Sequence, residues 1–212
     1  MYRDIVVGNV ENLHLVDGKG RQYRGADQEW FPLSWQRRAG CGPTTASQLI
    51  LYNSRANADL PFMTVTDKDS MVTLMDEVWQ YITPGIMGVH LVSHFTAGLE
   101  RYLTNRGADF KITTLLIPKK REERPSFDEV LDFIVTRLEA DQPVAFLNLN
   151  NGGVANLDPW HWVTVVGLKQ ESAKGPVQLE IYDAGLSMII DFTQWWEKTT
   201  RAAGFVSLVP SE

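Results

Sequence analysis

Apolar and polar residues follow different periods in the two halves of the chain. In the first half, apolar residues recur every three or four positions, the spacing of one face of an amphipathic helix. This spacing predicts helices at 44–52, 70–81 and 93–105. In the second of them the apolar positions are Met71, Leu74, Met75, Val78 and Trp79. We therefore expect the first half of the chain to be mostly helical.

Local signals set the ends of these helices. Pro43 suits an opening turn, where a missing N–H costs nothing, and Gly107 is typical of the residue that closes a helix. Ser126 and Glu129 form a capping box that predicts a further helix to about residue 140. The first 35 residues are polar and glycine-rich, with extended pieces at 4–7 and 12–16. The aromatic-rich segment 30–35 is interpreted as a loop that covers the core.

The second half of the chain is dominated by short β-branched and apolar runs. Strands are predicted at 110–117, 144–149, 161–168, 177–182, 186–190 and 205–209, and Asp191 is expected to cap a short helix at 192–202. Helices first and antiparallel strands afterwards favour an α+β fold. No repeat, low-complexity segment or linker divides the sequence, so we expect a single domain over 1–212.

Composition and charge exclude several classes of protein. The chain has 212 residues, 44% of them hydrophobic, and a net charge of −6. An acidic chain is a poor ligand for nucleic acid, and the one basic run, 119–121, is followed at once by two glutamates. The sequence contains no signal-peptide pattern and no run of about 18 apolar residues, so we expect a cytoplasmic protein without a membrane span. No cofactor is expected.

Cys41 is the only cysteine, so an internal disulfide is excluded. A lone cysteine is either a small buried apolar side chain or a reactive thiol. Cys41 lies at the start of a predicted helix, and a helix N-terminus and a nearby imidazolium both favour the thiolate, which is the reactive form. Gly40 and Gly42 are expected to leave the surrounding space open to a substrate and to let the backbone turn sharply.

A reactive thiol needs a histidine partner, and His161 is the best placed of the four. It opens a predicted strand, which would anchor it, and it follows a glycine-containing loop. A strand end without a role is the alternative. His90 and His94 are four residues apart and could share a helix face, but two histidines without a third ligand are a weak metal signal, so no metal site is expected. His14 lies in a polar extended stretch.

Two further residues complete a possible constellation. Asp183 ends the strand after His161, and antiparallel pairing of the two strands would return it to the level of His161, where it could hold the imidazole tautomer. It could equally be a turn aspartate before Gly185. Gln36 and the Cys41 N–H could stabilise an oxyanion, although Gln36 alone reads as a loop residue. Trp160 and Trp162 flank His161 and could line a cleft or belong to the core.

Together these residues resemble the papain-like cysteine peptidases, and within them the C39-like group. The residues that carry the resemblance are Gln36, the CGPT run at 41–44, the HWV run at 161–163 with Gly167, and Tyr182-Asp183. The stretch 191–200 resembles the closing helix of that group. The resemblance implies a papain-like fold in which a central helix carries the nucleophile. The helical segment between Ile50 and Phe110 has no counterpart in this pattern and is expected to shape the cleft.

The resemblance also implies residue roles. Cys41 would be the nucleophile, His161 its base and later the acid, Asp183 the residue that orients His161, and Gln36 with the Cys41 N–H the oxyanion donors. The substrate would contain a peptide, isopeptide or other amide bond. Two alternatives stay open: an acyltransferase of the transglutaminase or phytochelatin-synthase type that uses the same acyl-cysteine, and a papain-like binding module with an unreactive thiol.

Overall fold

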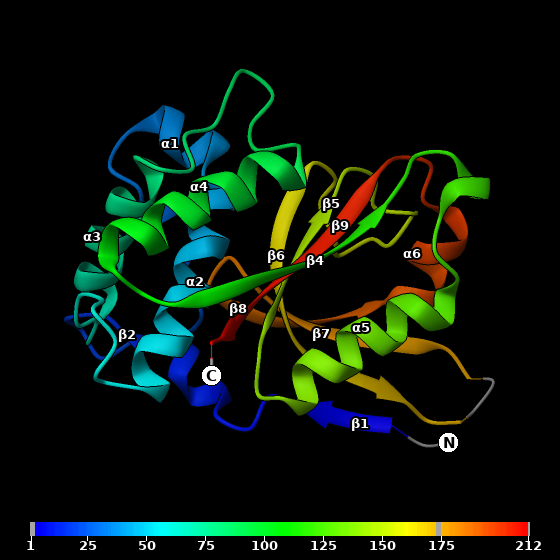
Figure 1. Ribbon diagram of the computed structural model, residues 1–212, viewed down its shortest axis with the longest axis horizontal. Coiled ribbons are helices and arrows are strands. Elements are labelled where there is room, and N and C mark those ends of the chain that lie inside the picture. Colours follow the sequence, from blue (N-terminus) through cyan, green and yellow to red (C-terminus); the bar gives the residue numbers. More distant parts are fainter. Residues whose placement is uncertain (1–2, 173–174, 212) are drawn as a thin grey trace.

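The computed structural model describes residues 3–172 and 175–211 (Figure 1). Its α-helices are α1 (Ser34–Ala39), α2 (Cys41–Ala56), α3 (Lys68–Trp79), α4 (Val92–Arg106), α5 (Phe127–Glu139) and α6 (Phe192–Lys198). Its strands are β1 (Arg3–Val6), β2 (His14–Val16), β3 (Gln22–Arg24), β4 (Phe110–Ile117), β5 (Val144–Asn148), β6 (His161–Gln170), β7 (Val177–Asp183), β8 (Leu186–Asp191) and β9 (Ala203–Pro210). Short 3-10 turns lie at Val10–Leu13, Gln28–Trp30 and Arg121–Glu123.

One large antiparallel sheet organises the second half of the chain. Its strand order is β4-β9-β5-β6-β7-β8, and β1 pairs with β6 as well. Since β5 pairs with residues 161–165 of β6 and β1 with residues 167–170, β1 extends the sheet beyond the end of β5. Every pairing between these strands is antiparallel. The α+β class expected from the sequence is confirmed.

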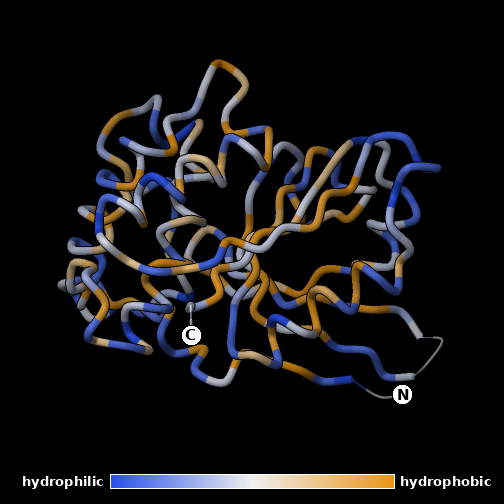
Figure 2. Tube along the Cα trace, viewed as in Figure 1, coloured by the Kyte–Doolittle hydropathy of each residue, from blue (hydrophilic) through white to orange (hydrophobic). Residues whose placement is uncertain are grey.

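Helices cover both faces of this sheet. Figure 1 shows α1–α4 on one side and α5 and α6 on the other, and Figure 2 shows apolar residues concentrated along the strands between them. Alternate residues of β5 enter different apolar clusters: Ala145 and Leu147 face the α2–α4 side, whereas Val144 and Phe146 face α5 and α6. A strand covered on both faces needs apolar residues at successive positions, which explains the nearly continuous apolar runs of β5 and β6.

The helix α2 lies at the centre of the helical layer. All its residues from Cys41 to Asn53 are buried, so the helix has no solvent-facing stripe over this length. Residues of α3 and α4, among them Met71 and Phe95, belong to the same apolar cluster as Leu49 and Ile50 of α2. The helical segment expected to be an insert that shapes the cleft is thus an integral part of the core.

Most predicted elements are present, and the differences have local causes. The aromatic segment expected to be a loop continues into the six-residue α1, where Gln36 accepts a hydrogen bond from the Leu33 N–H. The last helix ends at Lys198 rather than 202, because Thr199 is already extended and β9 begins at Ala203. Gly107 closes α4 in the left-handed conformation, as expected.

Candidate active site

Cys41 is the first residue of α2, which places its thiol at the N-terminal end of a buried helix. The N–H groups at this end have no partner inside the helix and carry a partial positive charge that favours an anion. Cys41 exposes 9% of its surface. The helix begins three residues before the predicted start at 44, so Cys41 lies within its first turn and not just ahead of it.

The two glycines beside Cys41 serve a different purpose from the one expected. Gly40 has an ordinary right-handed backbone, with φ of −83°. A Cβ atom at Gly40 would lie 2.6 Å from the Phe31 ring, and one at Gly42 would lie 2.9 Å from Val89. Close packing therefore excludes a side chain at both positions. The expectation of open space around the cysteine was wrong, because Phe31 and Val89 fill that space.

His161 and Asp183 are brought together by strand pairing. The strands β6 and β7 are antiparallel, with Thr164 opposite Tyr182, so the end of β7 returns to the start of β6. The Nε2 atom of His161 lies 2.8 Å from Oδ1 of Asp183. This is the arrangement that the sequence predicted for the two residues.

A tight turn fixes the Asp183 carboxylate. Asp183 pairs with Leu186 across the β7–β8 hairpin, and both residues between them have positive φ, 50° for Ala184 and 71° for Gly185. This is the geometry of a two-residue type I′ turn. Asp183 Oδ1 also accepts the Ala184 N–H at 2.9 Å. Asp183 is therefore both a turn aspartate and the partner of His161, two readings that the sequence had left as alternatives.

The imidazole of His161 is buried and interacts with both Asp183 and Cys41. Burial by itself lowers the pKa of His161, since the charged ring loses hydration. Hydrogen bonds to Asp183 and Cys41, together with the negative charge on these partners, outweigh burial and raise the pKa to about 10. At neutral pH the ring is therefore an imidazolium within hydrogen-bond reach of the thiol. We refer to Cys41, His161 and Asp183 as the Cys41 cluster.

The loop before His161 is held by residues that sequence reasoning missed. Asn148 pairs with His161 across the β5–β6 ladder and is fully buried. Its amide group donates to the Asp158 carbonyl, and its Oδ1 accepts the Trp195 N–H at 3.2 Å. Trp160, directly before His161, has a φ of 59°, which is rare for a bulky residue and is maintained only by surrounding structure. In the sequence, the signal that could have identified Asn148 was an asparagine inside an otherwise apolar predicted strand.

Gln36 lies in α1 and has a carboxylate partner. Its Nε2 atom donates to Oδ1 of Asp76 on α3 at 3.0 Å, while its Oε1 atom accepts the Leu33 N–H. An amide nitrogen carries two protons, so one remains beyond the bond to Asp76. The structure thus anchors Gln36 on a neighbouring helix. Asp76 was not among the residues singled out from the sequence.

The two tryptophans beside His161 have opposite environments. Trp162 is buried: its ring stacks on Phe95 with centroids 4.2 Å apart, and its Nε1–H donates to the Val89 carbonyl. Trp162 therefore belongs to the core, which decides between the two alternatives that the sequence left open and removes it from the cleft candidates. Trp160 is exposed, and its ring lies 6.1 Å from the His90 ring and 5.3 Å from the Arg201 guanidinium.

The other histidines lie outside the Cys41 cluster. His14 contacts Tyr182 and Arg24, and burial, followed by the Arg24 charge, lowers its pKa. His90 precedes α4, whereas His94 lies within it, so the two do not share a helix face. Within residues 3–172 and 175–211, no group of three or more His, Cys, Asp or Glu side chains is arranged to hold a metal ion.

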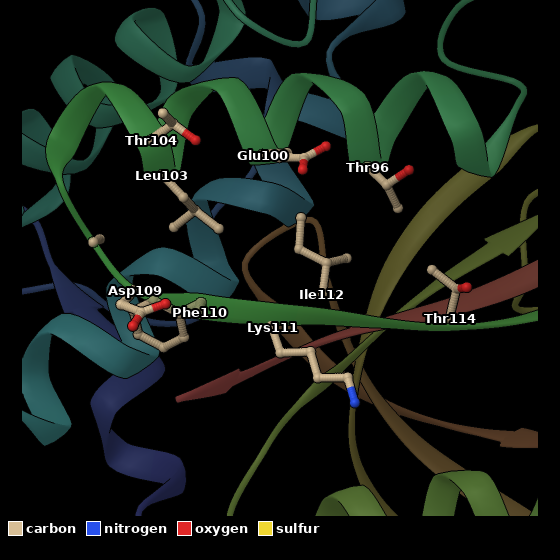
Figure 3. Close-up of a pocket in the computed structure, with 10 residues that line it drawn as sticks. Thr96, Glu100, Leu103, Thr104, Asp109, Phe110, Lys111, Ile112 and Thr114 are labelled. Atoms are coloured by element: carbon tan, nitrogen blue, oxygen red, sulfur yellow. The ribbon is translucent and has the colours of Figure 1, made fainter. Parts of the chain in front are cut away.

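Two cavities differ in their relation to the Cys41 cluster. One of them, of about 480 Å³, lies between α4 and β4. Figure 3 shows Thr96 and Glu100 on its α4 wall and Ile112 on its β4 wall. It is formed by α4, β4 and the segment that joins them, so it lies apart from the cluster. A second cavity, of about 240 Å³, is formed by the segment 90–93 and by the ends of β4, β5 and β9, next to the start of β6.

Comparison with known proteins does not assign this site. No family model matches the chain, and no curated protein sequence matches it. Across the part of the chain that the structure describes, we find no helix with the length and apolar character needed to cross a membrane.

Proposed function

We propose that this protein is a cysteine-dependent hydrolase of amide bonds, with the papain-like fold that its motifs resemble. The observation that carries the proposal is the Cys41 cluster: a thiol at a buried helix N-terminus, next to an imidazole that a carboxylate holds through Nε2. A cysteine nucleophile is activated by an adjacent base, and a third group commonly orients that base, which is the order of contact in this cluster. The helix and the sheet that carry them are joined through a shared core, which favours a rigid site.

The charge state of His161 defines the first half-reaction. With Nε2 on Asp183, Nδ1 is the nitrogen available to Cys41. The thiolate sulfur of Cys41 attacks the carbonyl carbon, and the carbonyl electron pair moves to oxygen. When the C–N bond breaks, the proton of His161 goes to the departing nitrogen. A thioester to Cys41 and a free amine remain.

In the second half-reaction the neutral His161 acts as a base. It removes a proton from water, which attacks the thioester carbonyl; the C–S bond breaks and the carboxylic acid leaves. The thiolate and the imidazolium are thereby restored. In this proposal the Cys41 N–H and the second amide proton of Gln36 stabilise the oxyanion in both steps.

Alkylation of the intact protein with iodoacetamide at pH 6 tests the nucleophile. We expect Cys41 to react at least about 10-fold faster than free cysteine, since a nearby imidazolium favours the thiolate. The variant His161→Ala should lose this advantage. His94→Ala, a partly exposed histidine on α4, is the matched control and should react like the wild-type protein. Wild-type reactivity equal to that of free cysteine would support the binding-module alternative.

A trapping experiment separates hydrolysis from acyl transfer. Cys41→Ser protein incubated with a cell lysate should retain an oxygen-linked acyl group, which mass spectrometry identifies. Wild-type protein is then given that acyl donor with water alone, or with amine and thiol acceptors. A free carboxylic acid in every case supports hydrolysis. Products that form only with an acceptor would replace hydrolase by acyltransferase, and absence of any acyl adduct would count against both enzymes.

A further inference from the structure

The strand β4 lies at one end of the large sheet, and its outer edge has no strand beside it. Among the described strands it pairs with β9 alone, over eight consecutive residues and without a shift in register. Proteins usually protect an edge strand by keeping it short, or by placing a proline, a bulge, a charged side chain or a covering segment there. The eight residues of β4 include no proline and only one charged residue, Lys111. This edge is therefore open to a further strand.

The strand at the opposite end of the sheet, β8, is better protected. It is six residues long, and the Asn156 side chain donates to its Ile189 carbonyl at 2.8 Å. The turn before β8 is bound as well, because the Arg24 N–H donates to the Gly185 carbonyl at 2.8 Å. In the described chain we find no corresponding contact from outside the sheet to residues 110–116. The two ends of the sheet therefore differ in how far their polar groups are already bound.

The pairing with β9 decides which backbone groups of β4 face outward. The Ser211 N–H donates to the Asp109 carbonyl at 3.2 Å, so these two residues, just beyond the paired strands, form a hydrogen-bonded pair of the antiparallel ladder. Bonded and non-bonded pairs alternate along such a ladder. Pro210, which has no N–H, accordingly lies opposite Phe110 in a non-bonded pair. The N–H and C=O groups that face away from β9 are therefore those of Phe110, Ile112, Thr114 and Leu116.

A groove runs between this edge and α4, and we call it the α4–β4 groove. It is the cavity of about 480 Å³, and Thr96, Glu100 and Thr104 line it at helical spacing on one face of α4. Figure 3 shows Ile112 pointing toward α4 and Lys111 pointing away from it. Residues opposite each other in an antiparallel pair have their side chains on the same face of the sheet. A residue added opposite Ile112 would therefore place its side chain in the groove.

The charges of the α4–β4 groove favour a basic side chain there. Its charged lining residues are Glu100, Asp109 and Lys111. Asp109 already accepts the Ser211 hydroxyl at 2.7 Å, and Lys111 points to the other face of β4. Glu100 is exposed and has no hydrogen-bond or ion-pair partner within the described residues. A second copy of this chain would bring its own Glu100 to the same edge, whereas a basic peptide complements the charge.

We propose that the β4 edge binds an extended peptide segment of a partner protein, which joins the sheet as a further strand and places a Lys or Arg side chain beside Glu100. In strand addition, backbone hydrogen bonds supply affinity, and alternate side chains supply specificity. Valine-like residues two positions to either side of the basic residue fit this edge, because Phe110, Ile112 and Leu116 are apolar. The groove lies apart from the Cys41 cluster, so the proposal does not depend on the proposed hydrolase.

Hydrogen exchange of single amides, followed by NMR, tests the edge. In the protein alone, the outward N–H groups of Ile112 and Thr114 should exchange at least about 10-fold faster than that of Thr113, which bonds to β9. The peptide acetyl-TVTKTVT-amide should slow the exchange of Ile112 and Thr114 saturably. Exchange that the peptide leaves unchanged would overturn the proposal. Slow exchange in the protein alone, together with a dimer mass in sedimentation, would also overturn it, because a second copy would then occupy the edge.

Charge reversal tests the side-chain contact. The peptide above and its counterpart acetyl-TVTETVT-amide are labelled and titrated with the protein at low ionic strength. Wild-type protein should bind the lysine peptide at least about 3-fold more tightly than the glutamate peptide. Glu100→Lys should reverse this preference, whereas Glu139→Lys, at an exposed glutamate that ends α5, should keep it. A preference that Glu100→Lys leaves unchanged would contradict the proposed contact.

A matched pair of variants tests the backbone pairing. Thr114→Pro removes an outward N–H and should weaken binding of the lysine peptide at least about 5-fold, whereas Thr114→Val keeps the N–H and should bind like wild type. Proline is tolerated on an edge strand where its nitrogen faces solvent, so the pairing with β9 should remain. If Thr114→Pro does not fold, the peptide is N-methylated at its lysine instead, which removes the opposing N–H. Equal affinity after the loss of either N–H would rule out strand addition.

Discussion

The two ends of α2 carry polar clusters of opposite kinds. At the N-terminal end is the Cys41 cluster, which the start of β6 and the end of β7 complete. Near the C-terminal end is what we call the Tyr52 cluster: the Tyr52 hydroxyl donates to the Asp141 carboxylate and accepts the Asn9 N–H, and the Asn9 side chain donates to Asp141 at 2.6 Å. Both clusters join α2 to segments distant in sequence.

The two clusters differ in whether all their polar groups serve to anchor neighbouring segments. In the Tyr52 cluster the Tyr52 hydroxyl and the Asn9 side chain both donate to Asp141, and the arrangement ties the N-terminal segment and the end of α5 to α2. One turn later Arg55 has a similar anchoring role, because its guanidinium donates to the carbonyls of Asn12, His14 and Val65. In the Cys41 cluster the last group in the chain of contacts is a thiol, to which the proposed function assigns the role of nucleophile. One helix thus anchors the fold at one end and, in the proposed function, presents the nucleophile at the other.

Removal of one carboxylate from each cluster should give the largest difference between the two clusters in the alkylation rate of Cys41. We expect Asp183→Ala to slow iodoacetamide alkylation of Cys41 at pH 6 by about 10-fold, close to the effect of His161→Ala, because His161 loses the group that orients and charges it. Asp141→Ala, the matched change at the other cluster, should leave the alkylation rate within about 3-fold while it lowers the melting temperature. Similar slowing in both variants would mean that the Cys41 cluster depends on general stability and not on local orientation.

The two clusters should respond to pH in separate windows. The pKa of His161 is raised from 6.5 to about 10, so the folded protein holds this proton more tightly than the unfolded chain. The resulting stability is fully present below pH 6.5 and is lost as pH rises to about 10, a change on the order of a few kcal/mol. Burial, followed by the bond to Asp141, raises the pKa of Tyr52 above its ordinary value of 10.0, so its contribution falls only above that pH.

Urea unfolding at intervals between pH 6 and pH 10 measures this dependence. The wild-type protein should lose stability across the interval, and His161→Gln should show a flatter curve. Tyr52→Phe should keep the wild-type slope. A slope that His161→Gln leaves intact would assign the titration to another group.

Loss of the Tyr52 hydroxyl should affect stability alone. Tyr52→Phe leaves the Asn9 N–H and the Asp141 carboxylate without this partner, and we expect the free energy of unfolding to fall by about 1.5–3 kcal/mol. Alkylation of Cys41 should be unchanged. Tyr23→Phe removes a comparable bond to Asp17 at the surface and should cost less. Equal losses in the two variants would contradict the structural role assigned to the Tyr52 cluster.

Loss of a hydrogen bond at the middle of α2 should have the smallest effect on stability and on alkylation of Cys41. Gln48 donates to the Thr164 hydroxyl at 3.0 Å and accepts the Ala26 N–H, so it joins α2 to β6 between the two clusters. Thr164→Val removes one of these bonds, and we expect a loss of about 1 kcal/mol with alkylation within about 3-fold of wild type. Thr114→Val on the exposed side of β4 is the control and should be near neutral. A large drop in alkylation by Thr164→Val would show that the Cys41 cluster extends along β6.

The local sequence pattern was sufficient to predict most helices and strands and part of the candidate site. The Ser126–Glu129 capping box and Gly107 define helix ends through residues only a few positions apart, and both lie where the sequence placed them. The pairing of His161 with Asp183 was predictable for a similar reason. Two strands joined by a short connection pair antiparallel, so the first residue of one meets the last residue of the other.

What only the tertiary structure decided involves contacts between distant segments. Gly40 and Gly42 are required by Phe31 and Val89, and Trp162 is a core residue because it stacks on Phe95, whereas Trp160 remains exposed. Asn148 and Asp76 entered the description only through neighbours far away in the chain, and the contact of His90 with Trp160 was likewise not predicted from the sequence. Periodicity states that a side chain is buried or exposed, but it does not name the partner that buries it. For this protein the sequence alone predicted the three residues of the Cys41 cluster, and packing between helices and sheet determined what surrounds them.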